Sequence, residues 1–181
     1  MDRGFTGDEF RIRTGAGDKH LRLLARNGLR YEFEMNMGRP NWRNEEVRFP
    51  LYLGEGMWEG VILDVGNPQC AVLVDEFPEN WQVLGAAVER YPRFPRRTNV
   101  SFFRVLDDHT IEARFWERGA GETLSSGTGS TGAALAAILR GVVRGPVRVV
   151  TVAGDLMLRW EGDAFLSGPA EIVARGEYFS G

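Results

Sequence analysis

The sequence predicts an α+β fold in which a layer of about ten strands curls around one central, buried helix. Most of the chain alternates apolar and polar residues, which is typical of strands. Residues 127–143 carry small and apolar side chains on every side until Arg140, which is the pattern of a helix buried all round. Residues 80–91 have apolar side chains at helical spacing, so a second helix is expected outside the strand layer. We expect residues 1–181 to form a single domain.

The expected strands are short runs separated by turn signals such as Asn27-Gly28, a strong hairpin dipeptide, and Gly154-Asp155. Residues 38–57, rich in Pro, Gly, Trp and Arg, are expected to form a long surface loop with a weak edge strand. The strand runs are 10–13, 20–25, 30–36, a run from residue 60, 70–75, 99–108, 110–119, 146–154, 155–162 and 164–173.

Composition excludes several classes of function. The net charge is −3 and there is no Lys/Arg run, so neither nucleic acid nor a membrane is an expected partner. Residues 123–139 are uncharged but too short and polar to span a bilayer, and residues 1–10 lack the apolar segment of a secretory signal. Cys70 is the only cysteine, and His20 and His109 show no metal-ligand spacing. We therefore expect a cytoplasmic protein without a structural metal.

A charged, glycine-rich segment, residues 116–129, leads directly into the expected buried helix. The amides of Gly127, Thr128 and Gly129 would lie at the helix N-terminus, where backbone N–H groups and the helix dipole favour an anion. Ser126 is placed as the N-cap or beside a bound ligand. The spacing alone is more typical of a capped helix preceded by a glycine turn. The segment lacks the lysine of a phosphate-binding loop, and it does not open a dinucleotide-binding βαβ unit.

Three longer motifs extend this local pattern to most of the chain. They are ERGAGETLSSGTGSTGAA at residues 117–134, GNPQC at 66–70 and YPRFPRRTNVSFF at 91–103. Three shorter motifs match the same family in their order and spacing along the chain: IRTGAG at 12–17, MGRP at 37–40 and SGPAEIVARGEY at 167–178. Together they resemble the C-terminal part of the diaminopimelate epimerases, in the wider proline racemase and epimerase superfamily.

The resemblance implies an amino-acid epimerase-type isomerase of the lysine and peptidoglycan precursor pathway that uses no cofactor. Such enzymes have two pseudo-symmetric lobes, each a strand layer wrapped around a central helix. The carboxylate of a small-molecule amino-acid substrate lies at the N-termini of both helices, and one cysteine from each lobe exchanges the α-proton. This chain matches the C-terminal lobe, so the N-terminal lobe is expected to be absent and the chain inactive alone.

At the helix start, the resemblance assigns the carboxylate-binding amides to Gly127 and Thr128. Ser126 stands where the family has its second catalytic cysteine, and a hydroxyl is a far weaker acid than a thiol. Gln69 replaces the histidine of the family's GNPHC motif, and Thr131 stands where another, non-catalytic cysteine is frequent. Cys70 matches the non-catalytic cysteine of that motif and is expected to be buried packing.

Four further residues are implied to bind substrate. Asn67 and Asn99 match asparagines that hold the distal amino-acid end, and Glu117 and Arg118 match a pair beside the reacting centre, with Glu117 also implied in catalysis. Turn formation by the asparagines and a solvated salt bridge between the charged residues are the alternatives.

Two other functions and two partners stay open. The chain could be a module that binds an amino-acid carboxylate without catalysis, or resemble relatives with Ser or Thr at this position that catalyse elimination. Its partner is expected to be the missing lobe or a second copy in a homodimer, because a lone lobe would uncover apolar side chains in and beside residues 38–57. The alternative is that these side chains fold into the lobe's own core. They are Trp42, Phe49, Leu51, Tyr52, Met57 and Trp58.

Overall fold

A computed structural model describes residues 7–14, 17–54, 56–177 and 179. The start of the N-terminal segment, residues 15 and 16 of the IRTGAG motif and Tyr178 of the C-terminal motif lie outside the described residues. In the described part of the chain, no helix is long and apolar enough to cross a membrane.

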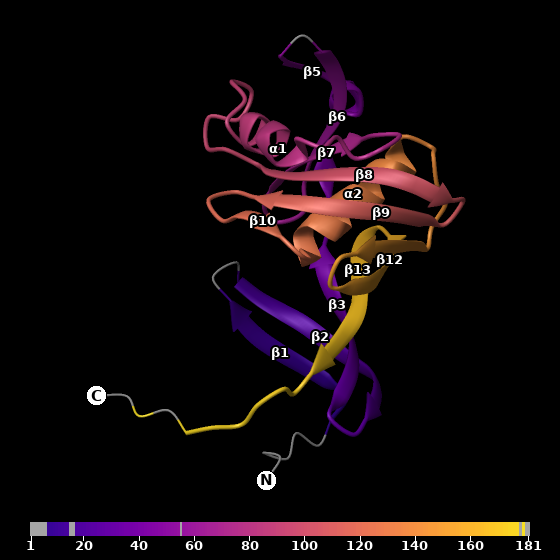
Figure 1. Cartoon of the computed structure of the whole chain (residues 1–181). Helices are drawn as coiled ribbons and strands as arrows, with labels where there is room; N and C mark the ends of the chain where they lie inside the picture. Colours follow the sequence, from indigo (N-terminus) through magenta and orange to yellow (C-terminus); the bar gives the residue numbers. More distant parts are fainter. Residues whose placement is uncertain (1–6, 15–16, 55, 178, 180–181) are drawn as a thin grey trace.

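The described residues form two α-helices and one mixed sheet, which has thirteen strands (Figure 1). The helices are α1 (Trp81–Glu89) and α2 (Gly127–Leu139), and a short 3-10 turn spans Asn44–Glu46. The strands are β1 (Glu9–Thr14), β2 (Gly17–Asn27), β3 (Arg30–Gly38), β4 (Asn41–Trp42), β5 (Phe49–Leu53), β6 (Gly56–Asp64), β7 (Pro68–Leu73), β8 (Asn99–Asp107), β9 (Thr110–Glu117), β10 (Gly121–Thr123), β11 (Val147–Thr151), β12 (Gly154–Glu161) and β13 (Asp163–Glu171).

The strand order is β1-β2-β3-β13-β12-β11-β9-β8-β7-β6-β4, with β10 paired to β9 and β5 to β6. Only β7 with β8 and β9 with β11 run parallel, and each of these parallel pairs is joined by a crossover that contains one helix. The hairpins expected around Gly28 and Gly154 are present. The topology therefore brings the start of α2 close to the ends of strands that are distant in sequence.

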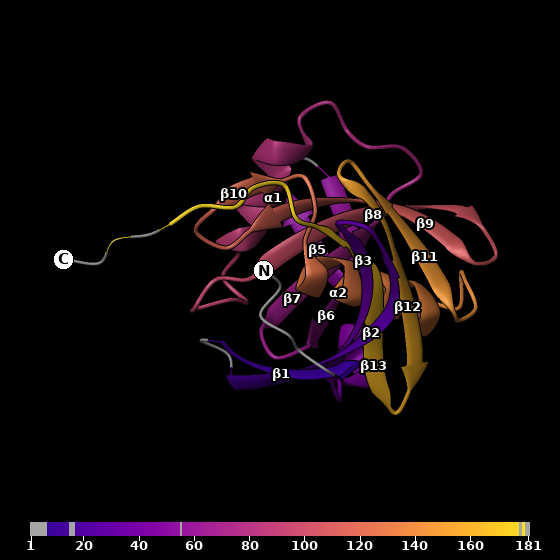
Figure 2. The same ribbon diagram turned by 90° about the horizontal axis from the view of Figure 1, so that it is seen from below.

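The helix α2 is buried as its composition predicts, since all nine residues from Gly129 to Ala137 are buried. It contacts β6, β7, β8, β9, β11, β12 and β13, and Figure 2 shows these strands on several sides of it. Small side chains on α2 permit this close approach, as at Gly132, where a Cβ would lie 3.1 Å from Gln69 Cγ. The helix ends at Leu139 and not at residue 143, because Gly141 has a φ of +69° that stops helical propagation.

The weak edge strand expected within residues 38–57 is confirmed, but the expected surface loop is wrong in its second half. β5 lies there, and Leu51 and Leu53 are buried in a core that also contains Val88 of α1. Phe49 and Trp58 pack against the same core, while Trp42 packs edge-to-face on Trp160.

Two of the six apolar side chains expected to be uncovered remain exposed. Tyr52 is 65% exposed and Met57 is 62% exposed. The alternative that most of this cluster folds into the lobe's own core therefore holds for the other four.

The first three strands form an extension that reaches away from the body of the molecule (Figure 1). One face of the extension carries Phe10, Leu21 and Phe33, with Phe10 and Phe33 in edge-to-face contact at a centroid distance of 6.0 Å. The same face continues through Met35 to Leu166, which packs in the core around α2.

Candidate active site

A side-chain N-cap defines the start of α2. Ser126 has an extended backbone (φ −147°, ψ 122°), and its Oγ accepts a hydrogen bond of 3.1 Å from Gly129 N, so Ser126 is the N-cap as expected. The first intrahelical bond runs from Ser130 N to Ser126 O. The amides of Gly127 and Thr128 therefore precede the helical hydrogen-bond ladder, where a helix offers its N–H groups no partner of its own. Both residues are only partly buried, whereas Ser126 and Gly129 are buried.

A polar link joins this helix start to the turn after β6. Asn67 donates through Nδ2 to Thr128 Oγ1 at 3.2 Å, across sixty-one positions of sequence. Gln69, which is buried, donates through Nε2 to Asn67 Oδ1 at 2.7 Å. Gln69 thus fixes the orientation of the Asn67 amide. Glutamine makes this bond without the titratable side chain of the histidine that it replaces in the family motif. In the described part of the chain, Gln69 Oε1 is buried without a hydrogen-bond partner.

A second polar link joins the same turn to the β9–β10 hairpin. Asn99 donates through Nδ2 to Pro68 O at 3.0 Å and accepts from Arg118 N at 3.0 Å. The Arg118 guanidinium donates to Arg96 O at 3.2 Å. The carboxylate of Glu117 accepts from Thr123 Oγ1 across the hairpin at 3.1 Å. No ion pair between Glu117 and Arg118 is found in the described residues, so each side chain is held by its own neighbour.

The seven residues proposed from the sequence therefore lie along one connected set of contacts. Thr128, next to Gly127 and the cap Ser126, bonds to Asn67. Pro68, the residue after Asn67, bonds to Asn99, which in turn bonds to the hairpin at Arg118 N. Three supporting residues did not emerge from the sequence: Ser101, which donates to Gly129 O at 3.2 Å, Thr123, and Glu89.

Cys70 lies outside this set of contacts. It is fully buried on β7, and burial raises the pKa of its thiol to about 12. A thiol with that pKa stays protonated near neutral pH, so it cannot act as a base. Its expected role as core packing is confirmed by its place beside Leu51 and Val72.

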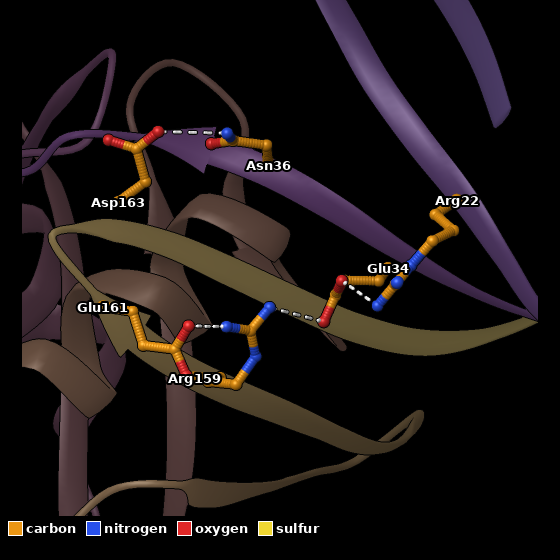
Figure 3. A network of polar contacts seen from close by, with 6 residues as sticks. All are labelled: Arg22, Glu34, Asn36, Arg159, Glu161 and Asp163. Carbon is orange, nitrogen blue, oxygen red and sulfur yellow. Dashed lines mark hydrogen bonds and ion pairs between the residues drawn. The ribbon is translucent and has the colours of Figure 1, made fainter.

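A cavity of about 570 Å³ lies elsewhere and is lined by residues of β1, β2, β3, β12 and β13. Two of its arginines, Arg22 and Arg159, are already paired, as Figure 3 shows. Glu34 accepts from Arg22 at 2.9 Å and from Arg159 at 3.2 Å, and Arg159 also pairs with Glu161. These pairs tie β2, β3 and β12 together, and none of the seven residues lines the cavity. Among the described residues there is no group of three or more His, Cys, Asp or Glu placed to hold a metal ion.

The fold is that of the racemases and epimerases. Among solved structures, a hydroxyproline epimerase from Agrobacterium vitis matches with a TM-score of 0.70 at 14% identity, over 94% of this chain and 59% of that chain. A predicted epimerase from Pseudomonas aeruginosa matches with a TM-score of 0.62 at 16% identity, over 96% of this chain and 70% of that chain.

The sequence comparisons identify the family. The model of the family described as "Diaminopimelate epimerase" matches residues 61–173. The diaminopimelate epimerase of Pelotomaculum thermopropionicum is 37% identical over 98% of this chain and 68% of its own length, and that of Moorella thermoacetica is 34% identical over 95% and 67%. The chain belongs to the diaminopimelate epimerase family, which is a family of isomerases, and it spans about two thirds of the length of these relatives.

Proposed function

We propose that this chain is the C-terminal lobe of a diaminopimelate epimerase-type isomerase of the lysine and peptidoglycan precursor pathway in the cytoplasm. In this proposal, residues 1–181 are one domain whose strand layer curls around α2, and this lobe would act together with an N-terminal lobe. The observation that carries the proposal is the capped, partly exposed start of the buried helix, which Asn67 links to the GNPQC turn. No cofactor is needed for this function.

The carboxylate of an amino-acid substrate fits the helix start, because the Gly127 and Thr128 amides and the helix dipole offer donors and positive potential there. Asn67 and Asn99 each use one amide hydrogen and one oxygen lone pair within the protein. Each amide therefore keeps one N–H and one lone pair for the distal end of a substrate. Arg118 and Glu117, on the hairpin beside them, would contact the same ligand.

The contacts of Ser126 give little support to a role in proton transfer. In the described residues, its hydroxyl makes one hydrogen bond, as the acceptor from Gly129 N, and no carboxylate or imidazole contacts it. A hydroxyl without an activating base is a poor acid and base near neutral pH. This geometry favours a second candidate function, a module that binds an amino-acid carboxylate without catalysis.

Replacing Thr128 by valine tests the proposed carboxylate site. The change removes the hydroxyl that accepts from Asn67 and leaves the backbone amide in place. We expect affinity for diaminopimelate to fall about 2- to 10-fold, the effect of one hydrogen bond of about 0.5–1.5 kcal/mol. Isothermal titration calorimetry measures the dissociation constant for diaminopimelate. Thr151→Val is the matched control, because Thr151 Oγ1 bonds Gly154 O in the β11–β12 turn and contacts none of the seven residues by a hydrogen bond. Equal losses in both variants would contradict the site.

Association with a second copy or with an N-terminal lobe is also part of the proposal. The exposed apolar side chains that support it are Tyr52 and Met57 on the β5–β6 hairpin and Ile12 and Leu24 on the extension. We expect sedimentation velocity to show a homodimer that forms with increasing concentration when the chain is alone. A strictly monomeric species at high micromolar concentration would argue against an uncovered interface.

A further inference from the structure

A buried carboxylate outside the seven residues has no role in the function proposed so far. Glu89 is the last residue of α1 and is 3% exposed. A carboxylate is unfavourable at both places, because the C-terminal end of a helix carries partial negative charge and burial removes water. Its position therefore requires specific donors.

Three donors reach Glu89. Its Oε2 accepts from Trp116 Nε1 at 2.9 Å, and its Oε1 accepts from Gly119 N at 3.1 Å and from Arg97 Nη1 at 3.3 Å. Burial acts to raise the pKa of Glu89, but the hydrogen bonds from Trp116, Gly119 and Arg97, with the charge of Arg97, outweigh it and lower the pKa. The carboxylate is therefore ionised at neutral pH.

The backbone conformation near two of these donors, Trp116 and Arg97, also favours their contact with Glu89. Gly85 of α1 rests directly on Trp116, since a Cβ at Gly85 would lie 2.8 Å from Trp116 Cβ. Arg97 has a φ of +60°, a conformation uncommon for residues other than glycine, and it still places its guanidinium on Glu89.

Two of the three donors flank the residues of the candidate site. Trp116 immediately precedes Glu117, and Gly119 immediately follows Arg118. One carboxylate thus fixes both ends of the dipeptide that carries these two side chains, while Asn99 holds its centre through Arg118 N.

We propose that Glu89 is the positioning residue of the Glu117–Arg118 hairpin: it clamps the hairpin onto α1 and so sets where these two side chains meet a ligand. Glu89 itself touches no substrate. The effect on ligand binding rests on the proposed function, whereas the effect on the hairpin does not.

The test is Glu89→Gln, compared with the parent chain by amide hydrogen exchange. Glutamine removes the charge and replaces one acceptor oxygen by a donor, so at least one of the three donors loses its partner. Exchange at Arg118, Gly119 and Ala120 should accelerate about tenfold or more, while exchange at Phe102 in the adjacent core stays close to that of the parent chain. Unchanged hairpin exchange, or equal acceleration over the whole chain, would overturn the proposal.

Two more variants keep this result interpretable. Glu122→Gln removes an exposed carboxylate that also links the hairpin to α1, through Gln82 at 3.3 Å, and should leave exchange unchanged. Trp116→Phe keeps the Glu89 carboxylate and removes one donor, so it should accelerate the same amides by a smaller factor of about two to five. If this milder variant also loosens the whole chain equally, the clamp is not local and the proposal fails.

Diaminopimelate affinity separates the clamp from the proposed function. We expect Glu89→Gln to weaken binding about fivefold or more, with Glu122→Gln unchanged. A looser hairpin with undiminished affinity would leave the clamp standing and refute the role of Glu117 and Arg118 in binding. An unchanged hairpin would refute the clamp, whatever the affinity.

Discussion

The purified chain is expected not to epimerise diaminopimelate above the uncatalysed rate. Inversion requires an acid–base group on each face of the α-carbon, and general acid–base catalysis contributes about 10²–10⁴-fold for each well-placed group. In the proposed function Ser126 takes one of these positions, and its hydroxyl accepts the capping hydrogen bond from Gly129 N. The thiol of Cys70 is buried, and burial raises its pKa to about 12.

Deuterium incorporation at the α-carbon, followed by proton NMR in D2O, measures this directly. A complete diaminopimelate epimerase, such as the relative from Pelotomaculum thermopropionicum, serves as the positive control. Turnover by this chain alone would refute the assignment of Ser126 to the cysteine position or reveal a different mechanism.

Replacing Leu135 by alanine is expected to lower the free energy of unfolding by about 2–5 kcal/mol. Leu135 is fully buried in the middle of α2, in the core that contains Phe103, Ile111 and Val149, and a truncated side chain there leaves a cavity. Urea denaturation monitored by circular dichroism gives the value.

The same substitution at Leu124 is the matched control. Leu124 is 60% exposed just before α2, so its truncation should change stability by no more than about 0.5 kcal/mol. Equal effects at the two leucines would mean that α2 is not the centre of the core.

The features of the fold that could be predicted are those with a clear periodicity. Small and apolar side chains lie on every side of α2, which favours burial, and the alternation of apolar and polar residues predicts β2 and β3. The bounds of β5 and the burial of its side chains were not predicted, because Pro50 and the surrounding Arg and Gly residues are typical of a loop with a weak edge strand at most. Proline is tolerated there because β5 pairs only with β6.

The candidate site could be located by its motifs, but its internal hydrogen bonds could not. Residue type alone does not reveal that Asn67 and Asn99 bond to Thr128, Pro68 and Arg118. Glu89 had a usable signal, because helical spacing from Trp81 and Gly85 puts it on the buried face of α1. A charged residue in that phase indicates a buried ion pair or hydrogen-bond network.

The central claim, that the start of α2 is an amino-acid carboxylate site, is tested most directly by titrating the 15N-labelled chain with diaminopimelate. The account predicts that the largest amide shift changes fall on Gly127 and Thr128, and that 1,5-diaminopentane, which lacks the carboxylates, produces none there. Shift changes confined to the arginine-lined cavity around Arg22 and Arg159, or equal changes at Gly127 and Thr128 with both compounds, would contradict it.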